Sequence, residues 1–488
     1  MHIDARTDFR LYHSNALDVL AGLLANELRT SVPGQGLLEP DVVLIPQVAL
    51  RRWLQATLAQ AHGVAANLEF LTPGEFVQRA LDANVPGRGE DLDAAALRWR
   101  IHAALADPAE LRERALQPLR SYLQDAPDPL KAWSLAGELA QAFEKYKAWR
   151  REWLLGWEAG EAPLDPQAAL WRRVAGGTRH RARRIHEYLQ GFADPESPLP
   201  AGLPRRLFAF AILNVSPDVL RVIATQARVG TLHLYVPSPS RDYWGDLQRV
   251  RGGDPEAAAG ENPLLRAWGA AGRDFMAVLG SYEVVHPDLE IRGDADPGER
   301  PGPEVGSTAA RRDGDGGQVD AAAGSDAGLP FDPGLLRRLQ SDLFHRRATP
   351  GFALRTAVDK TDPSLQLHAC HTRLRELQVL HDQLRALFED PRFDPPLQPR
   401  EVAVLAPDID PYLPYLDAVF GGRGRGDAIP YAVADASPLA GEPLAEVFLR
   451  LLALPVARFG LVETLDLLAS PPLAEAAGLD AAAFVRLH

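Results

Sequence analysis

The sequence predicts an α/β protein in which a large helical insertion interrupts a parallel sheet. Two stretches near the N-terminus, residues 8–13 and 41–46, have the pattern of strands, and each is followed by an amphipathic helix. Residues 92–192 then have an almost wholly helical pattern, and strand patterns return at 207–213 and 231–236. Because strands stand on both sides of the helical stretch, we expect it to be inserted between strands of one sheet.

The helices expected after the first two strands have clear apolar faces. Ser14 or Asn15 can cap the first of them, since short polar side chains accept hydrogen bonds from the free N–H groups of a helix start. The first stripe consists of Leu17, Leu20, Leu24 and Leu28, and the second of Leu50, Trp53, Leu54 and Leu58.

A second α/β unit is expected near the C-terminal end. A strand at Leu365–Ala369 precedes a helix that Thr372 can cap, and strands follow at Glu401–Leu405 and Ile429–Ala434. The apolar side of that helix carries Leu374, Leu377, Leu380, Leu384 and Leu387.

The chain of 488 residues is long enough for two to four domains. Residues 293–334 are rich in Gly, Asp, Ala and Pro, which predicts a mobile segment that buries little apolar area. The end at His488 has no closing element, so we expect a fragment of a longer chain. The predicted division is a first sheet segment at 1–66, the helical insertion at 67–204, a second sheet segment at 205–292, a largely disordered linker at 293–362 and the start of a second domain at 363–488.

Composition excludes several classes of protein. Hydrophobic residues make up 46% and charged residues 24%, as in globular proteins, and no apolar run has the length of a membrane span. The N-terminus does not resemble a signal peptide, and the single cysteine, Cys370, excludes an internal disulfide, so we expect a cytoplasmic protein. The net charge of −13 argues against a general nucleic-acid coat, although a local basic channel remains compatible with it.

Neither element of a nucleotide-hydrolysing site is present. Only four of the 52 basic residues are lysines, and none of the four follows a glycine, so the Gly-Lys pair of a phosphate-binding loop is absent. The turn where that loop would lie, residues 44–52, contains no glycine. The strand at 207–213 ends in Asn214-Val215-Ser216-Pro217, without the acidic pair that would hold magnesium. We therefore expect no ATPase in this chain.

An arginine-rich segment is the first candidate for binding DNA. Residues 172–184 contain no acid, and guanidinium groups suit phosphate contacts, although a solvated helix face is the alternative. The tryptophans and tyrosines near 146–171 either stack on bases or pack in a core, and their helical spacing favours the core. The basic residues of the segment are Arg172, Arg173, Arg179, His180, Arg181, Arg183 and Arg184.

Two other groups of polar residues do not predict a metal site. His368, Cys370 and His371 lack a fourth ligand at any usual spacing. Asp408 and Asp410 stand beside prolines, which is typical of a turn. We expect no metal and no cofactor in this chain.

Several segments resemble the RecC family, the gamma subunits of exodeoxyribonuclease V. The matches run in the same order as in the family from about residue 9 to about residue 450, and only the 293–334 segment lacks one. They include Leu11–Leu20, Ala65–Phe70, Asp242–Asp246, Asn262–Phe275, His368–His381, Val404–Gly421 and Ile429–Tyr431.

The resemblance implies a superfamily-1 helicase-like fold that has lost its ATP chemistry. Pro407 stands where such helicases usually carry a phosphate-contacting arginine, which agrees with this loss. The family implies a non-catalytic subunit of the RecBCD helicase–nuclease, which carries the 3′-ended single strand, recognises the Chi sequence and acts in double-strand-break repair by homologous recombination. Its implied partners are RecB-like and RecD-like subunits, which use ATP and Mg²⁺, together with single-stranded and forked double-stranded DNA.

The resemblance also implies which residues lie along the DNA path. Arg150 and Arg181 match family arginines near the recognition tunnel, and Glu144 keeps an acidic position. The family's base-reading Gln and Thr side chains are replaced here, so we expect DNA passage but not recognition of the same Chi sequence. The replacements are Pro46, Val48 and Arg52, with further departures at Thr72 and Gln78.

Two alternatives remain open at this point. An active helicase or ATPase would require the absent Gly-Lys pair. An AddB-type subunit of a related complex would use a cysteine-bound iron–sulfur cluster, whose ligands could lie partly outside this sequence; the block at 262–275 argues against it.

Overall fold

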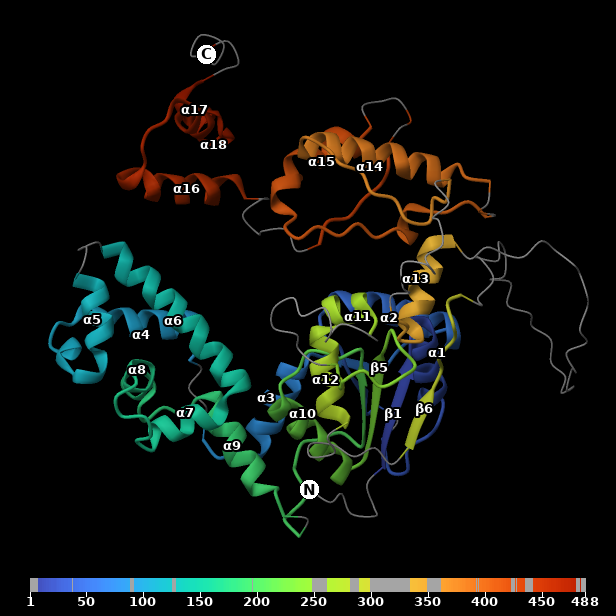
Figure 1. Ribbon diagram of the computed structural model, residues 1–488, viewed down its shortest axis with the longest axis horizontal. Coiled ribbons are helices and arrows are strands. Elements are labelled where there is room, and N and C mark those ends of the chain that lie inside the picture. The colour runs from blue at the N-terminus through green and yellow to red at the C-terminus, as the bar shows by residue number, and fades with distance from the viewer. Residues whose placement is uncertain are drawn as a thin grey trace, which may run out of the picture. The chain divides into compact units, whose positions relative to one another are not determined.

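The computed structural model places the chain in two compact units, residues 1–300 with 333–360 and residues 301–332 with 361–488 (Figure 1). The structure describes residues 8–36, 38–87, 92–124, 129–194, 196–247, 261–280, 289–298, 334–348, 361–391, 393, 395–422, 426, 428–434, 442–479 and 483.

The first unit is built on a six-stranded sheet in the order β3-β2-β4-β5-β1-β6, and all of its strand pairs are parallel. This confirms the four predicted strands and the α/β class. The strands are β1 (Asp8–Ser14), β2 (Asp41–Leu44), β3 (Leu68–Leu71), β4 (Arg206–Phe210), β5 (Thr231–Pro237) and β6 (Leu289–Arg292).

Two strands, β3 and β6, were not predicted. Leu68 of β3 pairs with Asp41 of β2. The sheet therefore extends past residue 67, where the sequence predicts the helical insertion to begin.

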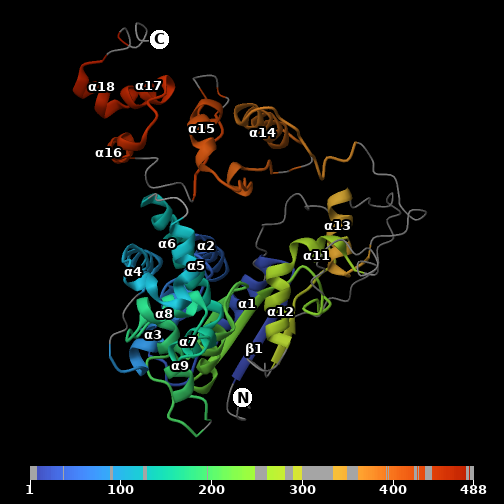
Figure 2. The same ribbon diagram turned by 60° about the vertical axis from the view of Figure 1, so that its left-hand side comes forward.

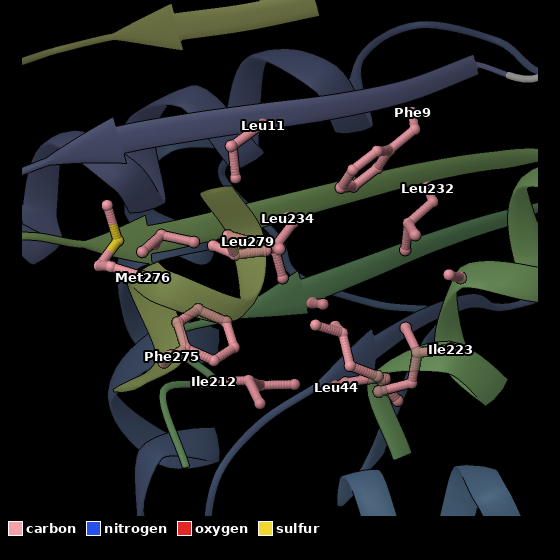
Figure 3. Packing of buried hydrophobic residues seen from close by; sticks show 14 of the residues in the cluster. Phe9, Leu11, Leu44, Ile212, Ile223, Leu232, Leu234, Phe275, Met276 and Leu279 are labelled. Carbon is pink, nitrogen blue, oxygen red and sulfur yellow. The ribbon is translucent and has the colours of Figure 1, made fainter. Parts of the chain in front are cut away.

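Helices cover both faces of the sheet. Successive residues of a strand point to opposite faces, so Val42 and Leu44 join one core while Val43 and Ile45 join the other. In the first core, Leu234 lies beside Leu279, with Met276 and Phe275 on the same side, and Leu232 lies further along the strand toward Ile223 (Figure 3). The covering helices are α1 (Leu17–Leu28), α2 (Ala49–His62), α3 (Pro73–Asn84), α10 (Pro217–Ala224), α11 (Pro263–Trp268) and α12 (Ala270–Gly280).

The predicted cap of α1 is wrong. Its N-cap is Ala16, without a side-chain hydrogen bond. Ser14 Oγ instead donates to the carbonyl of Gly293 (2.9 Å), and Asn15 Nδ2 donates to that of Ala295 (2.7 Å). These two side chains tie the end of β1 to the segment after β6.

The helical insertion has a core of its own, which includes Leu97, Ile101, Phe143 and Trp171. Its helices group beside the sheet (Figure 2), as the sequence predicts. They are α4 (Ala94–Ala106), α5 (Gln117–Gln124), α6 (Pro129–Trp149), α7 (Arg151–Glu158), α8 (Pro166–Ala175) and α9 (Arg181–Gly191).

Part of the predicted linker is folded. Helix α13 (Gly334–Phe344) belongs to the first unit, and the carbonyl of Phe344 accepts hydrogen bonds from Arg241 N and Ser240 Oγ, both at 3.1 Å. Residues 299–333, which hold most of the segment predicted to be mobile, lie outside the described residues.

In the second unit, the predicted helix after Thr372 is present, but the predicted strands are not. Thr372 caps α14, accepting from Arg375 N at 3.2 Å, as predicted. The described residues of 365–369, 401–405 and 429–434 form no strand, and Leu367 and Leu405 are 95% and 94% exposed. The helices are α14 (Arg373–Phe388), α15 (Leu413–Phe420), α16 (Pro443–Ala453), α17 (Leu461–Ala469) and α18 (Pro471–Ala477). Among all helices of the described residues, none is long and apolar enough to cross a membrane.

Candidate nucleic-acid interface

The carboxyl ends of the parallel strands meet at one edge of the sheet, where ligands of open α/β sheets usually bind. The turn after β2 lies between β3 and β4 at this edge, and Pro46, Gln47 and Val48 in it are exposed. Two N–H groups in the first turn of α2 already donate to carbonyls of the preceding turn: Leu50 N to Gln47 O (3.2 Å) and Arg51 N to Val48 O (3.1 Å). The turn therefore offers an open surface rather than a phosphate-binding loop.

The end of the neighbouring strand β4 carries one nearby acid, Asp218, in the first turn of α10. Its Oδ1 atom lies 3.2 Å from Arg151 Nη1 and 3.0 Å from Arg221 Nη1. Both guanidinium groups are already bound to this carboxylate. In the part of the chain that the structure describes, no group of three or more His, Cys, Asp or Glu side chains could hold a metal ion.

Three of the predicted arginines border this edge. Arg52 is exposed on α2. Arg150 is exposed at the α6–α7 junction, and the adjacent Arg151 pairs with Asp218 in the first turn of α10, the helix that follows β4. Arg181 is exposed at the start of α9, and a Cβ atom on Gly74, just after β3, would lie 3.9 Å from its Nη1 and Nη2 atoms. The three arginines thus stand around the ends of β3, β2 and β4.

The family of the chain follows from its sequence comparisons. A family model for the N-terminal domain of RecC matches residues 9–345, more than half of the chain. The chain belongs to the RecC family. A second model, for the fourth domain of the RecBCD enzyme subunit RecC, matches residues 441–488. The family predicted from the sequence is confirmed, and the AddB-type alternative is not supported.

Curated relatives agree with this assignment. RecBCD enzyme subunit RecC of Escherichia coli strain K12 is 29% identical over 526 residues, which cover 95% of this chain and 43% of that protein. The RecC subunit of Haemophilus influenzae is 27% identical, and the match covers 96% of this chain and 44% of that protein. The RecC subunit of Mycobacterium tuberculosis strain H37Rv is 28% identical, and the match covers 95% of this chain and 41% of that protein. The chain spans less than half the length of these relatives.

Apart from Arg181, the arginines of the 172–184 segment of this RecC-family chain do not form the acid-free cluster that the sequence suggests. Acids from other segments fold back onto three of them: Arg173 lies 3.1 Å from Glu110 and 2.9 Å from Glu113, and the buried Arg184 lies 2.8 Å from Asp82. The hydrogen bond that Arg173 donates to the carboxylate of Glu113 raises the pKa of Arg173 above its usual value. The third is Arg183, which pairs with Glu158.

The remaining two arginines of the segment also have partners within the chain. Arg172 Nη1 donates to the carbonyls of Trp157 and Glu161, both at 3.1 Å. Arg179 pairs with Glu187 of its own helix region. Together with Arg173, Arg183 and Arg184, these arginines hold the helical insertion together, so the acid-free cluster expected from the sequence is not present in space. Contact of these arginines with DNA stays a prediction.

Glu144 is paired as well. Its Oε1 atom lies 2.7 Å from Nζ of Lys147, one turn further along α6. Its acidic charge is therefore balanced locally. Sequence reasoning missed Arg151 and Asp218, and the only signal for this pair was an acid in the first turn of α10.

A buried carboxylate, Glu158, organises the end of α7. Its Oε1 atom accepts from Trp171 Nε1 (2.9 Å) and lies 2.6 Å from His180 Nε2, and it also pairs with Arg183. Burial raises the pKa of Glu158, but the hydrogen bond and charge of His180, with the bonds from Trp171 and Arg183, outweigh this and lower it. The carboxylate thus joins α7, α8 and α9 in its ionised form.

Proposed function

We propose that the chain is the non-catalytic DNA-channel part of a RecBCD-type helicase–nuclease of the cytoplasm, acting in double-strand-break repair by homologous recombination. In this proposal the 3′-ended single strand passes along the carboxyl edge of the sheet, past the turn at 45–48. RecB-like and RecD-like subunits are its partners, and they use the ATP and Mg²⁺. Single-stranded and forked double-stranded DNA are its nucleic-acid ligands.

One observation carries the proposal: in a RecC-family chain, exposed Arg52, Arg150 and Arg181 border a sheet edge that has no phosphate-binding loop. Such an edge can bind the backbone of a strand but cannot hydrolyse a nucleotide. Guanidinium groups supply phosphate contacts that do not depend on base sequence.

The side chains of the turn at 45–48 also bear on which DNA sequence is recognised. Pro46 and Val48 present apolar side chains, and Val48 is 69% exposed. Such side chains cannot make the paired hydrogen bonds by which Gln and Thr discriminate base edges. We therefore propose that this chain recognises a recombination signal other than the family's best-known Chi sequence.

Photo-crosslinking tests the DNA path. The complete complex, with its partner subunits, is bound to a forked DNA whose 3′ tail or 5′ tail carries photoreactive bases, and crosslinked peptides are identified by mass spectrometry. We expect crosslinks from the 3′ tail to peptides containing Arg52, Arg150 or Arg181. Crosslinks to these peptides from the 5′ tail alone would contradict the proposal.

An ATPase assay tests the absence of catalysis. We expect the isolated chain to show no DNA-stimulated ATP hydrolysis, because the Gly-Lys pair is absent. Turnover that persists after contaminating helicases are removed would instead favour an active helicase.

A further inference from the structure

Two tryptophans flank Arg150 at the α6–α7 junction, and both are largely open to solvent. Trp149 is 47% exposed and Trp153 is 51% exposed. The other tryptophans of the 146–171 segment are in the core: Trp157 is 8% exposed and Trp171 is fully buried. The structure thus separates Trp149 and Trp153, here called the tryptophan platform, from the aromatic residues that serve packing.

Trp153 is held firmly from one side. The ring centroids of Tyr146 and Trp157 lie 5.7 Å and 6.4 Å from that of Trp153, and the adjacent Leu154 is buried in the core of the insertion. The ring therefore loses little conformational freedom when a ligand covers its exposed part.

The junction is also fixed relative to the sheet edge. Arg151 is largely buried, and its pairing with Asp218 places the platform beside the end of β4. A second acid, the exposed Glu152, lies 3.9 Å from the guanidinium of Arg151. The platform thus borders the candidate interface without being part of the turn itself.

The chemistry of the platform suits an unpaired nucleobase. The guanidinium of Arg150 lies 5.3 Å from the Trp153 ring centroid, and its Nη1 atom donates only weakly to the carbonyl of Trp149, at 3.3 Å. Aromatic rings beside a cation are the usual means by which proteins bind single strands, because every base has a stackable face and a flanking phosphate.

We propose that Trp153, assisted by Trp149, stacks on an unpaired base of the single strand, and that Arg150 turns from the ring to the neighbouring phosphate. This inference rests on the proposed DNA path. It adds a stacking contact that tolerates any base, next to the arginines that hold the backbone.

Binding measurements with matched variants test the platform. In the complete complex without ATP, the affinity for a 3′-tailed fork is measured by fluorescence anisotropy over a salt series. We expect Trp153→Ala to weaken binding about fivefold or more and Trp153→Phe to retain most of it. The salt slope should not change, since no phosphate contact is removed. Thermal unfolding of each variant shows whether it is folded.

A control tryptophan and an altered DNA make the test specific. Trp99, 64% exposed on α4, lies in the same insertion, and Trp99→Ala should bind as the unaltered chain does. A 3′ tail of abasic sugars offers phosphates but no bases, so Trp153→Ala and the unaltered complex should bind it equally.

The outcomes separate this inference from the proposed function. Equal binding of the normal tail by the unaltered complex and Trp153→Ala, with Arg150→Ala weakened, would overturn the stacking role alone. Loss of partner subunits from the Trp153→Ala complex, with DNA affinity unchanged, would make the platform a protein interface and would also overturn it. A complex that does not bind the 3′ tail at all would refute the proposed function.

Discussion

The guanidinium of Arg151 lies 3.2 Å from the carboxylate of Asp218, and this ion pair joins the helical insertion to the helix that follows β4. The two side chains are only 10% and 14% exposed. Because charges removed from water need a partner, each side chain holds the other in place. The exposed Arg150 next to it is thereby held at the carboxyl edge of the sheet.

Replacing Asp218 should therefore loosen the insertion. We expect Asp218→Asn to lower the free energy of unfolding by about 2–3 kcal/mol, because it leaves Arg151 largely buried without its anion. Urea denaturation measures the change. Glu69→Gln is the matched control: its pair with Arg79 is 36–44% exposed, and its loss should cost less than about 1 kcal/mol. Equal losses in the two variants would contradict the prediction.

The buried carboxylate of Glu158 should matter more than its exposed counterparts. Glu158→Gln removes the charge that His180 and Arg183 share, and we expect a loss of about 2–4 kcal/mol in the free energy of unfolding. The change can be followed by tryptophan fluorescence during urea denaturation. Glu187→Gln, which breaks the half-exposed pair with Arg179, is the control and should cost under about 1 kcal/mol. A larger effect at Glu187 would disprove the central role of Glu158.

Local pattern predicted most of the first unit. The buried strands β2, β4 and β5 are short apolar runs, and the helices of the insertion have regular apolar stripes, so their periodicity sufficed. β3 and β6 are the two edge strands of the sheet, and β3 has no buried residue, so neither is a buried apolar run like β2; they are strands because a parallel neighbour supplies their hydrogen bonds. In the second unit, strand-like runs at 401–405 and 429–434 have no such neighbours among the described residues, and they stay irregular.

The candidate site was predictable only in part. Sequence identified Arg150 and Arg181 through their resemblance to family positions, and both are exposed as a DNA contact requires. It could not show that Glu110, Glu113 and Asp82 fold onto Arg173 and Arg184. An acid-free stretch of sequence is not an acid-free region of space, because partners of a helix come from distant segments.

Acidification should destabilise the sheet through His13. Burial lowers the pKa of His13 to about 4, with the charge of Glu290 opposing and that of Arg292 adding to this effect. The unfolded chain, with an ordinary histidine pKa near 6.5, binds the proton more readily. Stability from the neutral ring is thus present above pH 6.5, falls as the pH drops toward 4, and the loss amounts to about 3 kcal/mol.

Urea denaturation across this pH range tests the assignment to His13. His13→Gln cannot take up the proton. Between pH 7 and pH 4, the free energy of unfolding of the unaltered chain should therefore fall by about 3 kcal/mol relative to that of His13→Gln. His371, exposed in the second unit, provides a control, since His371→Gln should leave the pH dependence unchanged. Parallel curves for the unaltered chain and His13→Gln would show that another group causes the acid sensitivity.

Exposed arginines and arginines paired with acids should differ when the DNA affinity of their alanine variants is measured over a range of salt concentrations. Arg150 and Arg181 are exposed at the sheet edge, so replacing either with alanine should weaken binding of single strands. If the side chain contacts a phosphate, the log–log salt slope falls by about one unit or less, and all sequences are affected alike. If it reads a base, the loss of about 1–3 kcal/mol is confined to strands with that base at one position.

Arg173 is the control, because two glutamates bind its guanidinium. Arg173→Ala should leave the DNA affinity and the salt slope unchanged and lower the free energy of unfolding slightly. The complete complex is titrated with single strands of several sequences at each salt concentration. If Arg173→Ala weakened DNA binding as much as Arg150→Ala and Arg181→Ala do, the division into two classes would be wrong. The whole 172–184 segment would then contact the strand, because pairing with acids would not prevent an arginine from binding DNA.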